Sequence, residues 1–274
     1  MSQPKLTLII SFYNKIDLLR KVLESVALQT MQDFEVVIAD DGSNAEVVEQ
    51  IHQLQATYPK PIVHVWHEDK GWRKNMILNK AVRAAQSEYL VFIDGDCVLE
   101  RHFLEEHYAA RTHGEVVTGR RVLLTPKTTE RLLSQPLDKH SFGCRLFCQL
   151  LWETVFGHQK TQMEQMIRLP RWIRKWFVHE RERFILGCNF SLYKDDLMAV
   201  NGFDERFLYP GYGEDIDLGL RLKRKGIRAV SRKCQLVEFH CYHAHFDTNY
   251  APNQALMQAN IEANVSYTPY GIQQ

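Results

Sequence analysis

The protein has 274 residues, 45% of them hydrophobic, and a formal net charge of +1. This length and apolar content suffice for one large core or a core with a modest appendage, and the near-neutral charge gives no field that would hold the chain on nucleic acid. No apolar run approaches the roughly 20 residues that a membrane-spanning helix needs, so we expect any membrane contact to be peripheral.

Residues 1–124 alternate strand-like and helix-like patterns. Runs rich in β-branched and aromatic residues predict strands at 6–11, 34–39, 62–66 and 89–93. Between them, apolar residues at helical spacing predict helices at 18–28, 45–58 and 74–85. The alternation predicts a parallel sheet with crossover helices, and ligands of such sheets bind outside the carboxyl ends of the strands. We therefore expect the polar residues that follow the strands to converge on one crevice.

From residue 125 to 183 the alternation stops, and helical spacing at 146–156 and 169–177 predicts a helical insertion. The alternation resumes with predicted strands at 184–193 and 228–230 and predicted helices at 195–201 and 214–225. The tail from residue 249 gives little signal beyond turn-forming prolines. We divide the chain into a first α/β half at 1–124, an insertion at 125–183, a second half at 184–250 and a tail at 251–274.

Two acidic loops follow predicted strands. Asp94-Gly95-Asp96 offers two carboxylates, which can bind Mg²⁺ or Mn²⁺ shared with substrate phosphates, although Asp-Gly also makes a tight turn. At the carboxyl edge of a parallel sheet we favour the metal. Asp40 and Asp41 repeat the arrangement one loop earlier and can accept hydrogen bonds from a nucleobase or ribose; a helix N-cap at the following Ser43 or Asn44 is an equally sound use.

The stretch 211–218 places two glycines around Tyr212 and then Glu214, Asp215 and Asp217 in the first turn of a predicted helix. The helix macrodipole alone favours carboxylates there, by roughly 0.3–1 kcal/mol each. The flexible aromatic lead-in and the acidic loop upstream favour a functional interpretation, namely chemistry on a phosphorylated sugar.

Three further clusters are less specific. His240, His243 and His245 lie close together, which makes one metal contact plausible, with packing or acceptor contact open for the others. Residues 71–75, including Arg73, offer amides and cations to a diphosphate or form a solvated helix start. Cys144 and Cys148 are predicted to be buried thiols on one helical face. The six cysteines form no Cys-x-x-Cys pair and no secretory signal is visible, so we expect reduced thiols in a cytoplasm.

The sequence resembles family 2 glycosyltransferases of GT-A fold, and its second half resembles the carboxyl-terminal module of β-1,4-galactosyltransferase-like and chondroitin-polymerase-like enzymes. The resemblance covers residues 5–125 and 184–250. It rests on Ile10-Ser11-Phe12-Tyr13-Asn14, Asp40-Asp41-Gly42-Ser43, the run 89–97 ending in Asp94-Gly95-Asp96-Cys97, Gly187-Cys188-Asn189, Asn201-Gly202-Phe203-Asp204-Glu205 and Gly211-Tyr212-Gly213-Glu214-Asp215-Ile216-Asp217.

The resemblance implies an inverting transfer of a hexose or N-acetylhexosamine from a nucleotide diphosphate donor, with a UDP-sugar expected, using Mn²⁺ or Mg²⁺. The acceptor would be a hydroxyl of a cell-surface or lipid-linked glycan such as lipopolysaccharide or capsule. The first half would bind the donor and the second half the acceptor. Tyr212 replaces the Trp usual in that glycine loop. The implied residues are Ser11, Asp40, Asp41, Arg73, Asp94 and Asp96 for the donor, Asp96, Asp94 and His243 for the metal, Asp215 as catalytic base with Glu214 beside it, and Asn189, Tyr212 and Gly213 for the acceptor.

Two other functions are less consistent with the sequence. A nucleotide-sugar pyrophosphorylase should have a glycine-rich basic loop after the first strand, where this chain has Ser11-Phe12-Tyr13-Asn14. A sugar-binding relative without activity should lack the base or the metal pair, and Asp94, Asp96 and Asp215 are all present.

The run 167–184 carries tryptophans beside cations, which suits a helix in a membrane interface. A helix packed on the protein's own core has the same pattern. If the acceptor is linked to a lipid, binding of the protein to the inner face of an anionic membrane would be useful.

Overall fold

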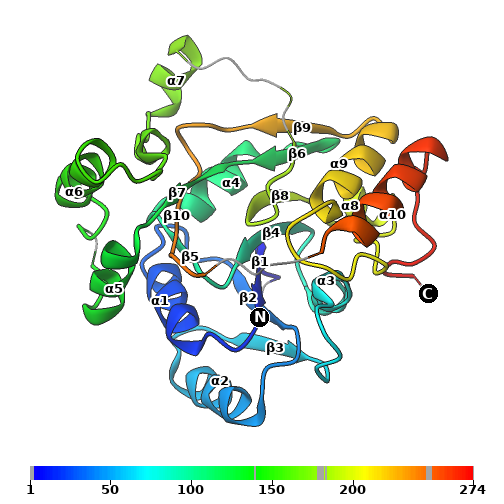
Figure 1. Cartoon of the computed structure of the whole chain (residues 1–274), viewed down its shortest axis with the longest axis horizontal. Helices are drawn as coiled ribbons and strands as arrows, with labels where there is room; N and C mark the ends of the chain where they lie inside the picture. The colour runs from blue at the N-terminus through cyan, green and yellow to red at the C-terminus, as the bar shows by residue number, and fades with distance from the viewer. Residues whose placement is uncertain (1–2, 139, 178–181, 183, 245–248, 274) are drawn as a thin grey trace.

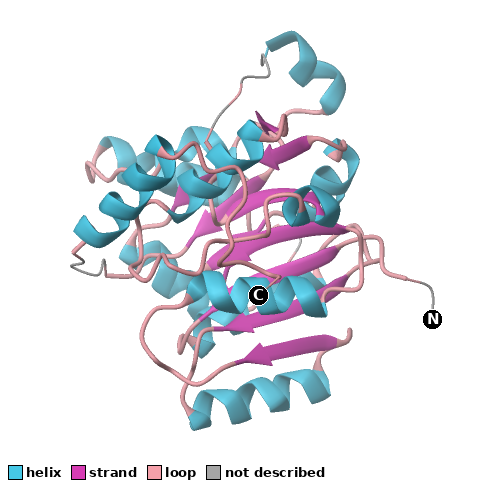
Figure 2. Ribbon diagram, turned by 90° about the vertical axis from the view of Figure 1, so that its right-hand side faces the viewer, coloured by secondary structure: helices cyan, strands magenta, loops and turns pink. Residues whose placement is uncertain are grey.

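The computed structural model describes residues 3–138, 140–177, 182, 184–244 and 249–273. A seven-stranded mixed sheet forms its centre, with helices on both sides (Figure 1, Figure 2). The strand order is β3-β2-β1-β4-β8-β6-β9. The strands are β1 (Thr7–Phe12), β2 (Glu35–Asp40), β3 (Ile62–Trp66), β4 (Tyr89–Asp94), β6 (Glu115–Thr118), β8 (Asn189–Tyr193) and β9 (Arg228–Ser231).

The first four strands of this order are parallel, as the sequence predicts. The chain reverses its direction of travel across the sheet between β1 and β4, which is where a doubly wound sheet opens a crevice. Strand β8 then pairs antiparallel with β4, Ile93 lying opposite Asn189. The two halves of the sequence therefore share one sheet, and the acidic loop after β4 lies next to the segment that leads into β8.

A small second sheet has the order β5-β10-β7, with β5 (Cys97–Leu99), β10 (Val237–His240) and β7 (Arg120–Leu123). Strand β10 is antiparallel to β5, and His240 lies opposite Cys97. This pairing carries the histidine segment, more than 140 residues away in the chain, to the Asp94-Gly95-Asp96 loop.

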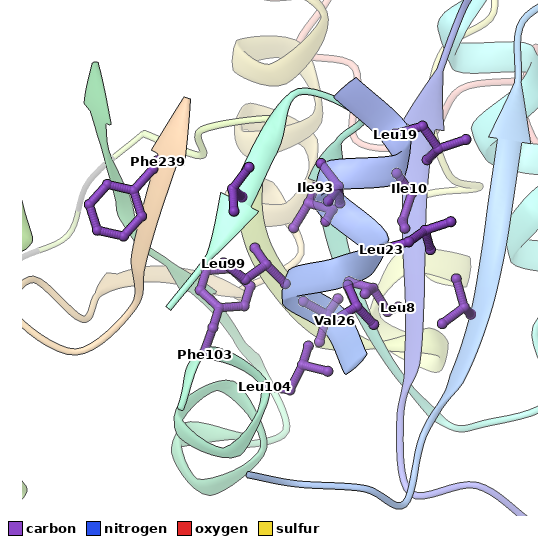
Figure 3. Close-up of a cluster of buried hydrophobic side chains, with 14 of the residues drawn as sticks. Leu8, Ile10, Leu19, Leu23, Val26, Ile93, Leu99, Phe103, Leu104 and Phe239 are labelled. Carbon is purple, nitrogen blue, oxygen red and sulfur yellow. The ribbon is translucent and has the colours of Figure 1, made fainter. Parts of the chain in front are cut away.

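Side chains that alternate along the central strands belong to two separate hydrophobic cores. Leu8 and Ile10 of β1 belong to the first core, and Ile9 belongs to the second. The first core packs beneath α1 (Ile16–Ala27), α2 (Ala45–Thr57) and α4 (Phe103–Ala110), as Figure 3 shows for α1 and α4. The second core packs beneath α3 (Lys74–Ala84), α8 (Lys194–Met198) and α9 (Glu214–Arg224). Burial on both faces explains why these strands read as continuous apolar runs.

The predicted insertion contains α5 (Pro126–Ser134), α6 (Cys144–Val155), the 3₁₀ helix η1 (Met163–Met166) and the short α7 (Arg171–Phe177). Leu146 and Leu150 of α6 join the first core. Cys144 and Cys148 are exposed, so the prediction of buried thiols was wrong: the helix turns Leu146 and Leu150, not its cysteines, to the core. No helix among the described residues has both the length and the hydropathy to cross a membrane.

Two of the segments that differ from the predicted elements lie near the site. The expected strand at 184–193 begins only at Asn189, and residues 184–188 form a loop without strand pairing. The tail contains a helix, α10 (Ala251–Glu262), which the sequence did not suggest because its apolar residues lack amphipathic spacing. Both segments contribute to the site.

Candidate active site

A cavity of about 920 Å³ opens at the carboxyl ends of the parallel strands. Its volume lies in the range of small-molecule sites. Both acidic motifs line it, Asp94 and Asp96 on one part of the wall and Glu214 and Asp215 on another. The lining also includes the aromatic rings of Tyr13, Trp72, Phe184 and Tyr212, the cations of Lys15, Lys74 and Arg121, and the imidazoles of His240 and His243.

Asp96 is the centre of a carboxylate–imidazole cluster. Its Oδ2 lies 3.2 Å from Nε2 of His243, and its Oδ1 lies 3.6 Å from Nε2 of His240. Burial acts to raise the pKa of Asp96, but the His243 hydrogen bond and the charge of His240 bring it down to about 2. A charged carboxylate beside imidazoles is a donor set that fits a divalent cation such as Mn²⁺. His245 lies outside the described residues.

Asp94 is held by a lysine rather than by a histidine. Lys74, the first residue of α3, places Nζ 2.6 Å from Asp94 Oδ1. Burial acts to lower the pKa of Lys74, but the carboxylates of Asp94 and Asp215 raise it above its usual value. The lysine is therefore a permanent cation between the two acidic parts of the wall.

Arg73, in the basic segment 71–75 at the start of α3, was predicted to contact the donor. Arg73 is not among the cavity-lining residues; its guanidinium donates to the carbonyl of Glu68. Adjacent residues at a helix start do not share a face, so only one of Arg73 and Lys74 reaches the cavity. The backbone N–H of Arg73 does contribute, because it donates to Asp41 Oδ2 at 2.8 Å.

Asp215 is fixed by the loop that precedes β8. The N–H of Gly187 donates to Asp215 Oδ2 at 2.8 Å. A Cβ added at Gly187 would lie 2.5 Å from both carboxylate oxygens, so this approach requires glycine. Burial raises the pKa of Asp215, and Lys74 opposes that rise. The predicted base is thus a half-buried carboxylate that lines the cavity.

Glu214 stands beside Asp215 and lacks a hydrogen-bond partner at Oε2 among the described residues. Burial, followed by repulsion from Asp215, raises the pKa of Glu214 to about 7. Glu214 therefore takes up a proton near neutrality, as proton-transfer groups often do. The third acid of the motif, Asp217, has a structural role: it pairs with Arg221 at 2.7 Å and accepts from Asn260 of α10 at 2.8 Å.

The predicted nucleoside side is a set of loops that hold one another. Asp41 lines the cavity and pairs with His67 at 2.7 Å, and Ser11 lines the same cavity. Asp40 lies elsewhere: it is fully buried, accepts from Ser43 N–H and pairs with His64. The side chain of Asp40 therefore closes the turn, whereas that of Asp41 lies at the cavity. The helix cap expected in this loop is Asn44, which accepts from Val47 N–H.

Of the three predicted acceptor residues, two line the cavity and one does not. Tyr212 and Gly213 line the cavity, and Gly213 precedes α9 with a φ of +97°. Asn189 is fully buried and donates to the carbonyls of Arg120 and Leu236, so it ties the start of β8 to segments of the second sheet and is not among the cavity-lining residues.

Helix α10 fixes the glycine loop. Asn253, 1% exposed, donates to the carbonyls of Tyr209 and Tyr212 at 2.8 and 2.9 Å. The ring of Tyr250 lies 6.3 Å from that of Tyr212. Sequence reasoning missed this contribution, and the absence of an amphipathic pattern in α10 left no signal to find it.

Two family models match the chain with these residues inside them. The model described as glycosyl transferase family 2 matches residues 7–168, and the model described as the N-terminal domain of galactosyltransferase matches residues 168–245. The first match extends through α5, α6 and η1, so the family model covers residues 125–168 of the predicted insertion. The predicted resemblance is confirmed for both halves.

Curated relatives are similar at moderate identity. A validoxylamine A glucosyltransferase of Streptomyces hygroscopicus is 28% identical over 270 residues, covering 95% of this chain and 58% of the relative. An O-antigen biosynthesis protein of Myxococcus xanthus is 27% identical over 83% of this chain and 16% of its own length, and the chondroitin synthase of Escherichia coli is 25% identical over 81% and 32%. The chain thus spans little more than half of the glucosyltransferase.

Solved structures confirm the predicted fold class, a mixed α/β GT-A sheet flanked by helices. A Pyrobaculum calidifontis mannosyltransferase in complex with GDP-Man and Mn²⁺ covers 89% of this chain and 59% of its own at a TM-score of 0.57 and 18% identity. GalNAc-T7 with UDP, GalNAc and Mn²⁺ covers 89% and 45% at a TM-score of 0.61 and 13% identity. With a family model matching more than half of its length, the chain belongs to glycosyl transferase family 2.

Proposed function

We propose that the protein transfers a sugar from a nucleotide diphosphate donor to a hydroxyl group of a glycan, with Asp215 as the catalytic base. The observation that carries the proposal is the position of Asp215 in the cavity: Gly187 N–H fixes one of its oxygens, and the Asp94-Gly95-Asp96 loop lines the same cavity. A sugar hydroxyl is a poor nucleophile at neutral pH, and a positioned carboxylate that removes its proton accelerates attack by roughly 10²–10⁴-fold. Direct attack in one step inverts the configuration of the anomeric carbon.

Asp96, His243 and His240 would hold Mn²⁺ or Mg²⁺, which supplies charge stabilisation to a leaving diphosphate. Asp94 would lie next to the ion and hold the ammonium group of Lys74 at the cavity, where that group attracts phosphate oxygens. Ser11 and Asp41 would contact the nucleoside, and Tyr212 would stack on a sugar face. The names of the O-antigen and chondroitin relatives favour a polysaccharide acceptor, such as lipopolysaccharide or capsule. A UDP-sugar is the donor that the motif resemblance implies.

The test is a comparison of binding and turnover in Asp215→Asn. The amide keeps the shape of the side chain but cannot take the hydroxyl proton, so transfer should fall at least 10²-fold while calorimetry shows nearly unchanged UDP affinity in the presence of Mn²⁺. A screen of nucleotide sugars for hydrolysis without acceptor identifies the donor first. Turnover close to that of the unsubstituted protein would refute the assignment of Asp215.

We also propose that the exposed apolar side chains of α6 and α7 dock on an anionic membrane that carries the acceptor. Trp152 and Phe156 on and after α6, and Trp172 and Trp176 on α7, are 59–74% exposed. Residues 167–178 contain cations but no carboxylate, which suits anionic lipid. Arg174, however, is buried and donates to the carbonyls of Lys233 and Ser231, so it belongs to the protein's own packing.

Flotation with anionic liposomes tests this docking. Changing Trp172 and Trp176 to Ser should leave the protein at the bottom of the gradient, whereas the control Ile261→Ala on exposed α10 should float like the unsubstituted protein. Equal flotation of the two variants, or none by the unsubstituted protein at low salt, would contradict docking through α7.

A further inference from the structure

Three side chains at and behind the cavity wall form a cluster that the proposed transfer does not use. They are Cys97 at the start of β5, Cys188 in the loop before β8, and Glu238 on β10. Their exposed fractions are 0%, 2% and 0%. Their thiol and carboxylate atoms lie within 4.8 Å of one another, and Cys188 Sγ lies 3.1 Å from Glu238 Oε1.

The second oxygen of Glu238 gives an independent indication of a ligand. Glu238 Oε2 is buried and has no hydrogen-bond partner among the described residues. A buried carboxylate oxygen without a partner is unfavourable, because it loses its hydration and gains nothing in return. Here the unpaired oxygen belongs to a side chain already in contact with a thiol.

We propose that Cys97, Cys188 and Glu238 bind a thiophilic divalent cation of the Zn²⁺ class. Two sulfurs at about 2.3 Å from Zn²⁺ in tetrahedral geometry lie about 3.8 Å apart, so ligand atoms within 4.8 Å of one another need to approach by no more than about 1 Å. Thiolates select Zn²⁺ over Mn²⁺ or Mg²⁺, which prefer oxygen ligands. This site therefore differs in donor chemistry from the carboxylate–imidazole cluster at Asp96, although Cys97 also lies within 4.8 Å of ligand atoms of Asp96 and His240.

The surrounding charges suit a bound cation. On binding, both thiols and the Glu238 carboxyl group release the protons they carry to solvent, so two thiolates and one carboxylate around a divalent ion leave one net negative charge. Arg121 supplies the balancing positive charge: its Nη1 lies 3.7 Å from Cys188 Sγ, and β7 places it opposite Glu238. Buried charges are tolerated when they are paired in this way. Cys188 and Arg121 line the cavity, which gives the ion a path of entry.

The position of each ligand indicates a structural role for the ion. Cys97 follows Asp96, Cys188 follows Gly187, and Glu238 precedes His240 by two residues. The ion would thus tie together the three segments that carry the predicted metal ligands and the backbone donor to Asp215. A clamp of this kind should raise the thermal midpoint of unfolding, since a ligand that binds only the folded state stabilises it.

Cobalt titration of the reduced, chelator-treated protein tests the site. The background is Cys144→Ser with Cys148→Ser, which removes two exposed thiols one helical turn apart that would bind metal adventitiously. We expect Co²⁺ to produce a thiolate charge-transfer band that saturates at one ion per chain and is bleached by Zn²⁺. Cys97→Ser and Cys188→Ser should abolish the band, and Glu238→Gln should weaken binding at least about tenfold.

Two further variants keep the result interpretable. Asp96→Ala should retain the band, which separates this site from the proposed catalytic metal. Arg121→Met leaves all three ligands in place and should lower the affinity for Co²⁺ by about 10–100-fold. The proposal is overturned if the reduced background protein shows no thiolate band, or if the band survives in both Cys97→Ser and Cys188→Ser. Because neither readout uses catalysis, loss of the proposed transfer activity would not affect the outcome.

Discussion

Replacing Gly187 with Ala tests whether the backbone of the 184–188 loop positions Asp215. The added Cβ would lie 2.5 Å from Asp215 Oδ1 and Oδ2, and the nearest ordinary van der Waals contact is 3.4 Å. The carboxylate must therefore retreat by about 1 Å, a displacement of the size that costs roughly 10²-fold in rate. Loss of the 2.8 Å hydrogen bond to Gly187 N–H adds to this, since hydrogen bonds to charged groups contribute about 1.5–3 kcal/mol.

We expect kcat to fall about 10²–10³-fold while the affinity for UDP in the presence of Mn²⁺ stays within about threefold, because among the described residues this loop hydrogen-bonds to Asp215, Thr118, Arg121 and Glu238 and to no predicted donor residue. Steady-state kinetics and calorimetry measure the two quantities. Gly219→Ala is the matched control: its Cβ would lie 3.6 Å from Ile185 Cδ1, and alanine favours the interior of α9 by up to about 1 kcal/mol. It should raise the unfolding temperature and keep full activity.

A folded Gly187→Ala protein with near-normal kcat would refute the reasoning, because Asp215 would then tolerate displacement and could not be the base. Loss of UDP affinity together with activity would instead show that the loop supports the donor.

Three other outcomes follow from the same cavity. Asp96→Ala should weaken metal-dependent UDP binding more than His243→Ala, since it removes a charge as well as a ligand; activity that survives exhaustive chelation would exclude the metal role of both. Lys74→Met should raise the KM for the donor about tenfold, with partial recovery in Lys74→Arg, whereas an unchanged KM would show that the lysine only neutralises Asp94. Burial raises the pKa of Glu214 to about 7, so ionisation of this side chain above that pH destabilises the folded state. Glu214→Gln should therefore stabilise the protein at pH 8, by on the order of 2 kcal/mol after allowance for solvent screening, but not at pH 5. Thermal unfolding at the two pH values measures the difference.

The sequence alone determined the parallel part of the sheet, the polar residues at its carboxyl edge and the two acidic motifs. Buried parallel strands are continuous apolar runs, and crossover helices have one apolar face, so both leave local patterns. The run ending at Ile93 and the helix beginning at Glu214 were therefore predictable to within a residue or two. The motif residues were predictable for the same reason, since they follow such elements directly.

Only the tertiary structure decided which polar side chains face the cavity. Arg73 and Lys74, or Asp40 and Asp41, are adjacent and chemically alike, and the orientation of their elements against the sheet separates them. The pairing of β10 with β5 brings His240 to Asp96, and packing of α10 brings Asn253 to the glycine loop. These contacts join residues far apart in the chain, so they leave no local pattern, and the burial and neighbouring charges that shift the pKa values of Glu214 and Asp215 arise only once those segments are assembled.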